Sequence, residues 1–210
     1  MKNRISEKLY LENLGYNKTK VPDFIFSTLV EEANTIKRKN IDTDEGNYGM
    51  YANPVLSGHI EKCFFVYNPL ESFRPWIINM ATEFLKDWDY QHSINNPMPL
   101  RPWMNFQKKH EYNSLHSHRA IFSYVIFIKI PYKYEKERKM ALAKDSSYSK
   151  STATFCFHHT NIIGKVMNQG IEVEEGDIIM FPSQLAHSVN PFFTSDDYRI
   201  TMAGDIINIQ

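Results

Sequence analysis

The sequence predicts a mostly β protein with flanking helices, and a jelly roll is the arrangement that fits it best. Two long segments with helical spacing of apolar residues precede residue 91. From residue 100 onward, short segments rich in β-branched and aromatic residues alternate with Gly, Pro, Asn and Asp. Helices followed by many short strands indicate a β-sandwich or small barrel with helices packed outside.

The length and composition allow one domain with a full hydrophobic core. The chain has 210 residues, of which 42% are hydrophobic and 14% aromatic, and this is not the composition of a disordered protein. We find no internal repeat and no low-complexity linker. We therefore expect a single domain over residues 1–210, in which a helical and irregular part, 1–99, packs on a jelly-roll core, 100–210.

Charge and cysteine content indicate the class of partner and the cellular compartment. The 24 basic and 24 acidic residues cancel, and the lack of a basic excess argues against a general nucleic-acid partner. Two distant cysteines form no secreted disulfide framework. The first residues lack the apolar core of a signal peptide, and no run approaches the roughly 20 apolar residues of a membrane span. We expect a cytoplasmic protein in a reducing compartment, which also suits ferrous iron.

The helices are expected over residues 21–40 and 70–90. In the first segment Pro22 and Asp23 are typical of a helix start. Its apolar residues at roughly helical spacing are Phe24, Phe26, Leu29, Val30 and Ala33. Those of the second segment are Ile77, Ile78, Ala81, Phe84, Leu85 and Trp88. The polar stretch 41–63 between the helices is expected to be an irregular loop.

Seven short segments after residue 100 are expected to form strands, because β-branched and aromatic residues dominate them. They cover residues 101–110, 121–130, 151–160, 165–173, 176–182, 185–193 and 198–207. The polar segment 144–151 predicts an exposed loop.

Two histidines, His116 and His118, precede the longest apolar run. On a strand they would share one face, whereas on a helix they would lie about 200° apart and could not chelate one ion. A stable site needs a third ligand, and His187 offers one at the start of another expected strand. The open side of such a site would admit substrate and oxygen. An isolated H-x-H is more often a pair of surface or hydrogen-bonded residues.

The other histidines and cysteines give weaker signals. His110 and His116 are spaced as H-E-x-x-x-x-H, which is not the H-E-x-x-H of metalloproteases. His158 and His159 are adjacent and point to opposite faces, so we expect both to be structural or at the surface. Cys156 lies near His158, but a zinc site would need a second clustered pair, and the other cysteine stands alone.

Arg199 and Thr201 share one face of the last expected strand. A guanidinium binds two carboxylate oxygens in parallel and the hydroxyl adds a donor, so the pair is suited to a carboxylate ligand. The alternative is a surface arginine paired with Asp196 or Asp197, and the pair taken alone favours this alternative.

Taken together, the motifs resemble those of the Fe(II)/2-oxoglutarate-dependent oxygenases, in particular a branch from bacteria and marine phages with an H-x-H motif. The resemblance covers residues 100–205 and rests on two blocks. The first block contains Trp103, Asn105, Asn113, His116, His118, Ser123, Tyr124 and Pro131. The second and more specific block contains Gly176, Phe181, Pro182, Ser183, Leu185, His187, Val189, Pro191, Arg199 and Thr201.

The resemblance implies a double-stranded β-helix, a cupin-like jelly roll that holds one Fe(II). His116 and His187 would be metal ligands. The implied reaction is the oxidative decarboxylation of 2-oxoglutarate to succinate and CO2. It is coupled to a hydroxylase-type oxidation of a small-molecule or peptide substrate, which the sequence does not identify.

The resemblance also implies a binding site for the cosubstrate 2-oxoglutarate. Arg199, assisted by Thr201, would bind its distal carboxylate. Tyr124 or Asn105 would add a hydrogen bond.

His118 departs from the usual ligand set of these oxygenases, two histidines and one carboxylate. Either His116, His118 and His187 all hold the iron as neutral imidazoles, or His118 is off the metal and water or another group substitutes. Three imidazoles leave the centre more positive by one unit, which favours other divalent metals such as Ni or Zn. We favour ligation by all three.

Two other classes of function remain open. A three-His cupin-like dioxygenase acting without 2-oxoglutarate would need the metal and be indifferent to Arg199. A non-catalytic jelly-roll binding module would hold no stoichiometric metal. Residues 42–58 and 133–150 are candidate lids, because binding residues concentrate on loops; the oligomeric state is not predicted.

Overall fold

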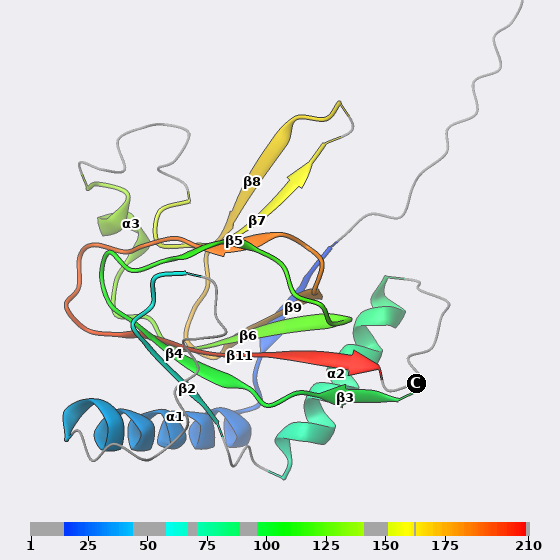
Figure 1. The fold of residues 1–210 in the computed structure, drawn as a ribbon, viewed down its shortest axis with the longest axis horizontal. Coiled ribbons are helices and arrows are strands. Elements are labelled where there is room, and N and C mark those ends of the chain that lie inside the picture. Colours follow the sequence, from blue (N-terminus) through cyan, green and yellow to red (C-terminus); the bar gives the residue numbers. More distant parts are fainter. Residues whose placement is uncertain are drawn as a thin grey trace, which may run out of the picture.

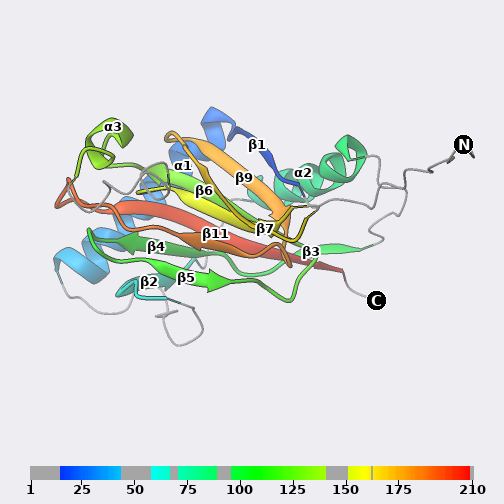
Figure 2. The same ribbon diagram turned by 90° about the horizontal axis from the view of Figure 1, so that it is seen from above.

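The computed structural model describes residues 15–43, 58–66, 71–88, 96–140, 151–161 and 163–208. Two antiparallel sheets face each other, and helices α1 (Asp23–Lys37) and α2 (Phe73–Asp87) cover the outer face of the larger sheet (Figure 1). Figure 2 shows the same layers from above. The prediction of a mostly β protein with flanking helices is confirmed.

The larger sheet has the strand order β1-β9-β6-β11-β4-β2, with β3 paired to β11. Its strands are β1 (Asn17–Lys20), β2 (Lys62–Phe65), β3 (Pro97–Pro99), β4 (Trp103–Gln107), β6 (Phe122–Lys129), β9 (Asp177–Pro182) and β11 (Arg199–Asn208). The smaller sheet has the order β5-β10-β7-β8. Its strands are β5 (Asn113–His116), β7 (Phe155–Thr160), β8 (Val166–Ile171) and β10 (His187–Val189). The π-helical turn η1 (Arg38–Asp42) and the short helix α3 (Tyr134–Glu137) lie outside the sheets.

Along the central strands of the larger sheet, successive side chains point alternately to the face covered by the helices and to the face opposite the smaller sheet. On β11, Ile200, Met202 and Ile206 are buried in the cluster that includes the helices. Residues between them, such as Thr201, face the smaller sheet and line a cavity. A second apolar cluster, which includes Phe127 of the larger sheet, fills part of the space between the sheets. The site therefore lies on the sheet face that the helices do not cover.

Both predicted helices are confirmed, but the buried side of α1 differs from the prediction. The buried residues of α1 are Ile25, Leu29, Ala33 and Ile36, and those of α2 are Phe73, Ile77, Ala81 and Phe84. Phe24, expected on the buried side, is 64% exposed because the stripe begins one residue later at Ile25. Trp88, expected to continue the stripe of α2, is exposed as well.

Four strands, β1, β2, β3 and β5, were not expected from the sequence. β1 pairs with β9, and β2 occupies part of the stretch 41–63 that was predicted to be a loop and pairs with β4. Most of both candidate lids, residues 44–57 and 141–150, lies outside the described residues, as does most of the predicted loop 144–151.

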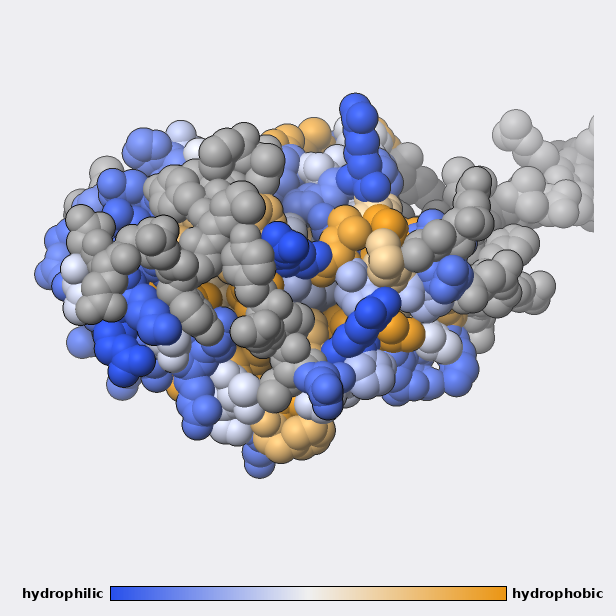
Figure 3. Space-filling model, turned by 60° about the horizontal axis from the view of Figure 1, so that its bottom comes forward, coloured by the Kyte–Doolittle hydropathy of each residue, from blue (hydrophilic) through white to orange (hydrophobic). Residues whose placement is uncertain are grey.

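The outer surface is mixed in character. Figure 3, which brings the lower side of Figure 1 forward, shows hydrophilic residues with smaller hydrophobic patches between them. Among the described residues, no helix has the length and hydrophobicity needed to cross a membrane.

Candidate metal centre

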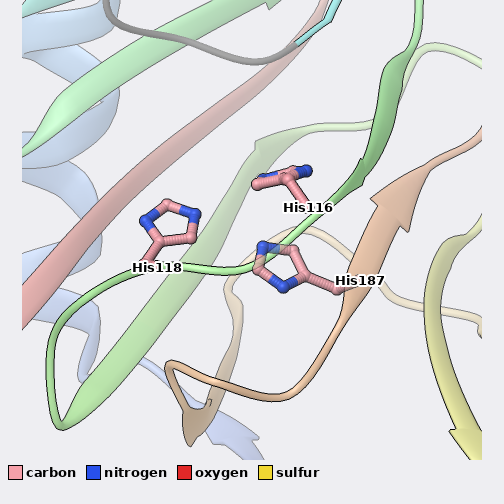
Figure 4. A group of neighbouring side chains, drawn as sticks. All are labelled: His116, His118 and His187. Carbon is pink, nitrogen blue, oxygen red and sulfur yellow. The ribbon is translucent and has the colours of Figure 1, made fainter.

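Three histidines converge between the two sheets (Figure 4). His116 is the last residue of β5, and His187 is the first residue of β10 and lies opposite it in register. His118 comes from the connection between β5 and β6. One ring nitrogen of each lies within 4.8 Å of those of the others, which is the spacing of side chains that can hold one metal ion.

The prediction that His116 and His118 share the face of one strand is wrong in detail, because β5 ends at His116. The backbone of His118 is instead held by the turn that follows β9. Its N–H donates to the carbonyl of Ser183 at 2.8 Å, and the Gln184 amide donates to its carbonyl at 2.9 Å. Since this turn leads directly to His187, one segment positions two of the three histidines.

Hydrogen bonds fix the same tautomer in all three rings. Nδ1 of His116 lies 2.6 Å from the carbonyl oxygen of Ser114, and Nδ1 of His187 lies 2.9 Å from that of Leu185. Nδ1 of His118 lies 3.0 Å from a carboxylate oxygen of Asp205. Carbonyl and carboxylate oxygens only accept, so each Nδ1 carries a proton, and Nε2 of each neutral ring keeps its lone pair.

Burial keeps the rings of His116 and His187 neutral at ordinary pH. His187 is 3% exposed, and this burial, together with the nearby His116, lowers its pKa to about 3. Burial also lowers the pKa of His116 below its usual value. Neutral imidazoles are the protonation state that ligates transition metals, so the donor set fits Fe(II), Ni(II) or Zn(II).

The histidines border a cavity of about 220 Å³ between the sheets. Its walls combine apolar and polar side chains. The apolar lining includes Val125, Phe127, Phe155, Phe181 and Val189, and the polar lining includes Asn105, Gln107, Asn113, Arg119, Thr201 and Asp205. A pre-formed cavity with convergent polar groups is typical of small-molecule binding.

Thr201 and Asn105 lie where a ligand in the cavity would meet them. They are opposite each other on β11 and β4, and the Asn105 amide lies 3.4 Å from the Thr201 hydroxyl. Asn105 is 6% exposed, and its Oδ1 has no hydrogen-bond partner. A buried amide oxygen without a partner is costly, so the pair is suited to a polar ligand.

Arg199 is buried, at 2% exposure, and its guanidinium makes five hydrogen bonds. It donates twice to Oε1 of Gln107, once to the Tyr132 hydroxyl, and once each to the carbonyls of Ala153 and Asn190. All of these acceptors are uncharged. Among the described residues that line the cavity, Gln107 is present and Arg199 is not.

The alternative in which Arg199 is a surface residue paired with Asp196 or Asp197 is wrong. Asp196 pairs with Lys109, and Asp197 pairs with Lys129.

Tyr124 borders the cavity, but its ring belongs to the core on the helix side of the sheet. The ring contacts Phe73 at a centroid distance of 5.9 Å. Its hydroxyl has no hydrogen-bond partner and lies against Gly204, where a Cβ atom would be only 2.3 Å away. The placement does not support the expectation that this hydroxyl reaches a cosubstrate.

Among the described residues, the other histidines and the two cysteines lie apart from the three converging rings. His158 bonds to Asn168 and Ser188, each at 2.8 Å, and His159 is exposed. Both are therefore structural or at the surface, as predicted. Cys63 and Cys156 are buried free thiols, and burial raises the pKa of Cys156 to about 11.

Sequence reasoning missed Asp205 and Gln107. Asp205 shares the cavity face of β11 with Thr201, so continuing the alternation beyond the motif would have placed it there. Gln107 follows Asn105 by two residues on β4, and the same rule applies.

Comparisons with known proteins agree with the geometry. The family described as "Putative 2OG-Fe(II) oxygenase" matches residues 101–205, which is half of the chain. A comparison with curated proteins finds no match.

Several solved structures share the fold. A prolyl-4-hydroxylase from Pseudomonas putida is 12% identical with a TM-score of 0.57, and the alignment covers 94% of each chain. The viral collagen prolyl hydroxylase of Paramecium Bursaria Chlorella virus-1, in complex with 2OG, is 13% identical with a TM-score of 0.51, covering 91% of this chain and 94% of that one. HygX from Streptomyces hygroscopicus, with nickel, 2-oxoglutarate and hygromycin B bound, is 8% identical with a TM-score of 0.55, covering 94% and 86%. These similarities confirm the double-stranded β-helix.

Proposed function

The chain belongs to the 2OG-Fe(II) oxygenase family, and from that premise we propose that it is an Fe(II)- and 2-oxoglutarate-dependent oxygenase of the hydroxylase type. The reaction would convert 2-oxoglutarate to succinate and CO2 and oxidise a second substrate. The observation that carries the proposal is the convergence of three imidazole rings, each of which is hydrogen-bonded through Nδ1.

In this proposal His116, His118 and His187 are the metal ligands and catalytic residues. Bound ferrous iron would supply the redox chemistry that splits 2-oxoglutarate and oxidises the substrate, which no amino-acid side chain provides. The protein would hold the imidazoles by their Nδ1 hydrogen bonds and limit the access of water to the buried ring of His187.

Thr201, Asn105 and Arg199 would bind the cosubstrate. A carboxylate in the cavity would meet the Thr201 hydroxyl and the Asn105 amide directly. Arg199 would reach it by exchanging the Gln107 oxygen for a carboxylate oxygen. A charged acceptor forms a stronger hydrogen bond with a guanidinium than a neutral amide does, so this exchange is favourable. We assign no cosubstrate contact to the Tyr124 hydroxyl, which is buried on the helix side.

The proposal is tested by succinate formation. Metal-free protein is loaded with Fe(II) and 2-oxoglutarate without oxygen, and succinate is measured after air is admitted. We expect metal-dependent turnover in the wild type and a large loss in Arg199→Ala. Full metal loading without succinate would contradict the proposal.

The second candidate is a three-His cupin-like dioxygenase that acts without 2-oxoglutarate. Two observations favour it: the absence of a carboxylate from the three-histidine cluster, and the fully bonded guanidinium of Arg199. This candidate would be supported if oxygen uptake depends on the metal but its rate is unchanged by adding 2-oxoglutarate and by Arg199→Ala. Failure to bind stoichiometric metal would instead support a non-catalytic binding module.

A further inference from the structure

We propose that Asp205 is a positioning residue that supplies, one hydrogen bond away from the metal, the carboxylate that the ligand set lacks. The inference rests on the proposed metal centre. It assigns Asp205 to act through His118, orienting that ring and placing a negative charge beside it.

The carboxylate of Asp205 is held on both of its oxygens. One oxygen lies 3.0 Å from Nδ1 of His118, and the other accepts a hydrogen bond from the Ser123 hydroxyl at 2.6 Å. Asp205 and Ser123 lie opposite each other on β11 and β6, in the middle of the larger sheet. His118 lies on the irregular connection between β5 and β6. Its side chain is therefore oriented by a hydrogen bond to Asp205 of the rigid sheet rather than by a regular backbone.

Further contacts restrict the His118 ring. The Trp103 ring lies nearly parallel to it, with an interplanar angle of 9° and a centroid distance of 6.0 Å. The turn after β9 fixes the backbone of His118 through Ser183 and Gln184. With Nδ1 bonded to Asp205, the ring can present only Nε2 to His116 and His187.

The three histidines differ in what their Nδ1 groups meet. His116 and His187 each donate to a backbone carbonyl, and only His118 donates to a carboxylate. Asp205 is the only acidic residue among the described residues that line the cavity. Three neutral imidazoles and a divalent ion carry a net charge of +2, and ionised Asp205 reduces this to +1. That is the charge of a centre with two histidines and one carboxylate.

Carboxylate partners of metal-bound histidines fix the ring and raise its basicity, and their loss commonly weakens metal affinity about 10- to 100-fold. We therefore expect Asp205→Ala to weaken metal binding by about that factor. Asp205→Asn keeps the shape and an oxygen that can accept from Nδ1, so a smaller loss is expected. Asp177→Asn is the matched control, because Asp177 is a poorly exposed carboxylate on β9 that pairs with Lys18 and Lys20.

The measurement is an anaerobic titration of each metal-free protein with Fe(II), and with Co(II) as a second probe, against a competing chelator. Unfolding temperatures of the metal-free proteins report separately on a purely structural role. The inference requires weaker binding in both Asp205 variants and unchanged binding in Asp177→Asn. If Asp205→Asn and Asp205→Ala both bind metal as tightly as the wild type, the inference is overturned, although the proposed metal centre would stand. A wild type that binds no metal would refute the proposed function itself.

A double-mutant cycle tests whether Asp205 acts through His118. In the His118→Ala background, Asp205→Ala should cause no further loss of affinity, because the ring that it orients is gone. A further tenfold loss in that background would overturn the inference, since it would make Asp205 a ligand in its own right.

Discussion

The two ends of the cavity differ in how they are prepared for a ligand. At the histidine end, formed by His116, His118 and His187, every ring is hydrogen-bonded through Nδ1. At the arginine end, Gln107 lines the cavity and bonds to Arg199, whose guanidinium donors all have a partner already. Asp205, which bonds to His118, and Arg199 lie six residues apart on β11. The metal end is pre-organised, whereas the arginine end requires an exchange of partners.

The largest effect is expected at the histidine end. His187→Ala removes one of three ligands and should weaken Fe(II) affinity about 100- to 1,000-fold, because each ligand of a zinc site accounts for about 3–4 kcal/mol of binding energy. His159→Ala, at an exposed histidine of β7, is the control and should leave affinity unchanged. An anaerobic chelator titration measures both. Equal affinity of His187→Ala and wild type would place the metal elsewhere.

Arg199→Ala is expected to lower the free energy of unfolding by about 2–3 kcal/mol, because it leaves buried acceptors such as Gln107 Oε1 without donors. Metal affinity should be retained, since the two ends are independent in this account. Urea unfolding and the metal titration measure the two quantities, with Arg199→Lys as the charge-preserving comparison. If Arg199→Ala is as stable as the wild type and produces succinate normally, Arg199 does not bind the cosubstrate.

The depressed pKa of His187 makes the metal-free protein sensitive to acid. The unfolded chain takes up a proton on this group near pH 6.5, whereas the folded protein does so only near its pKa of about 3. Stability from this residue is therefore complete above pH 6.5 and falls as the pH decreases, by up to about 1.4 kcal/mol per unit. Urea unfolding of wild type and His187→Gln between pH 7.5 and 5 should show a steeper decline in the wild type. Parallel curves would contradict a neutral buried imidazole.

The smallest effect is expected at the arginine end, on the affinity for 2-oxoglutarate. Gln107→Ala removes the acceptor that occupies two donors of Arg199. A net hydrogen bond of about 0.5–1.5 kcal/mol corresponds to a roughly 2- to 10-fold change, so 2-oxoglutarate should bind more tightly by that factor. Isothermal titration with the metal-loaded protein under anaerobic conditions measures it. Weaker binding would mean that Gln107 itself contacts the cosubstrate.

The fold was largely predictable because its central strands are strongly apolar. Most residues of β6 and β9 are buried, and sequence patterns detect such apolar runs well. β1 has the sequence NKTK and is mostly exposed, so it carries no apolar signal and is recognisable only through its pairing with β9. The buried side of α1 was misplaced because Phe24 and Ile25 are adjacent apolar residues, and only packing selects between them.

The site was predictable as a set of residues but not as a geometry. Spacing and motif resemblance brought His116, His118 and His187 together, yet the turn that holds His118 is separated from it by more than sixty residues. The acceptors around Arg199 come from four separate segments, and no local pattern predicts that they satisfy it. Such long-range hydrogen bonds depend on tertiary packing rather than on local sequence.

Anomalous diffraction from crystals grown without oxygen, with Fe(II) and 2-oxoglutarate, tests the central claim most directly. We predict one iron per chain, within about 2.0–2.2 Å of Nε2 of His116, His118 and His187, with 2-oxoglutarate directed toward Thr201 and Arg199. Iron bound without His118, or no iron between the two sheets, would contradict it.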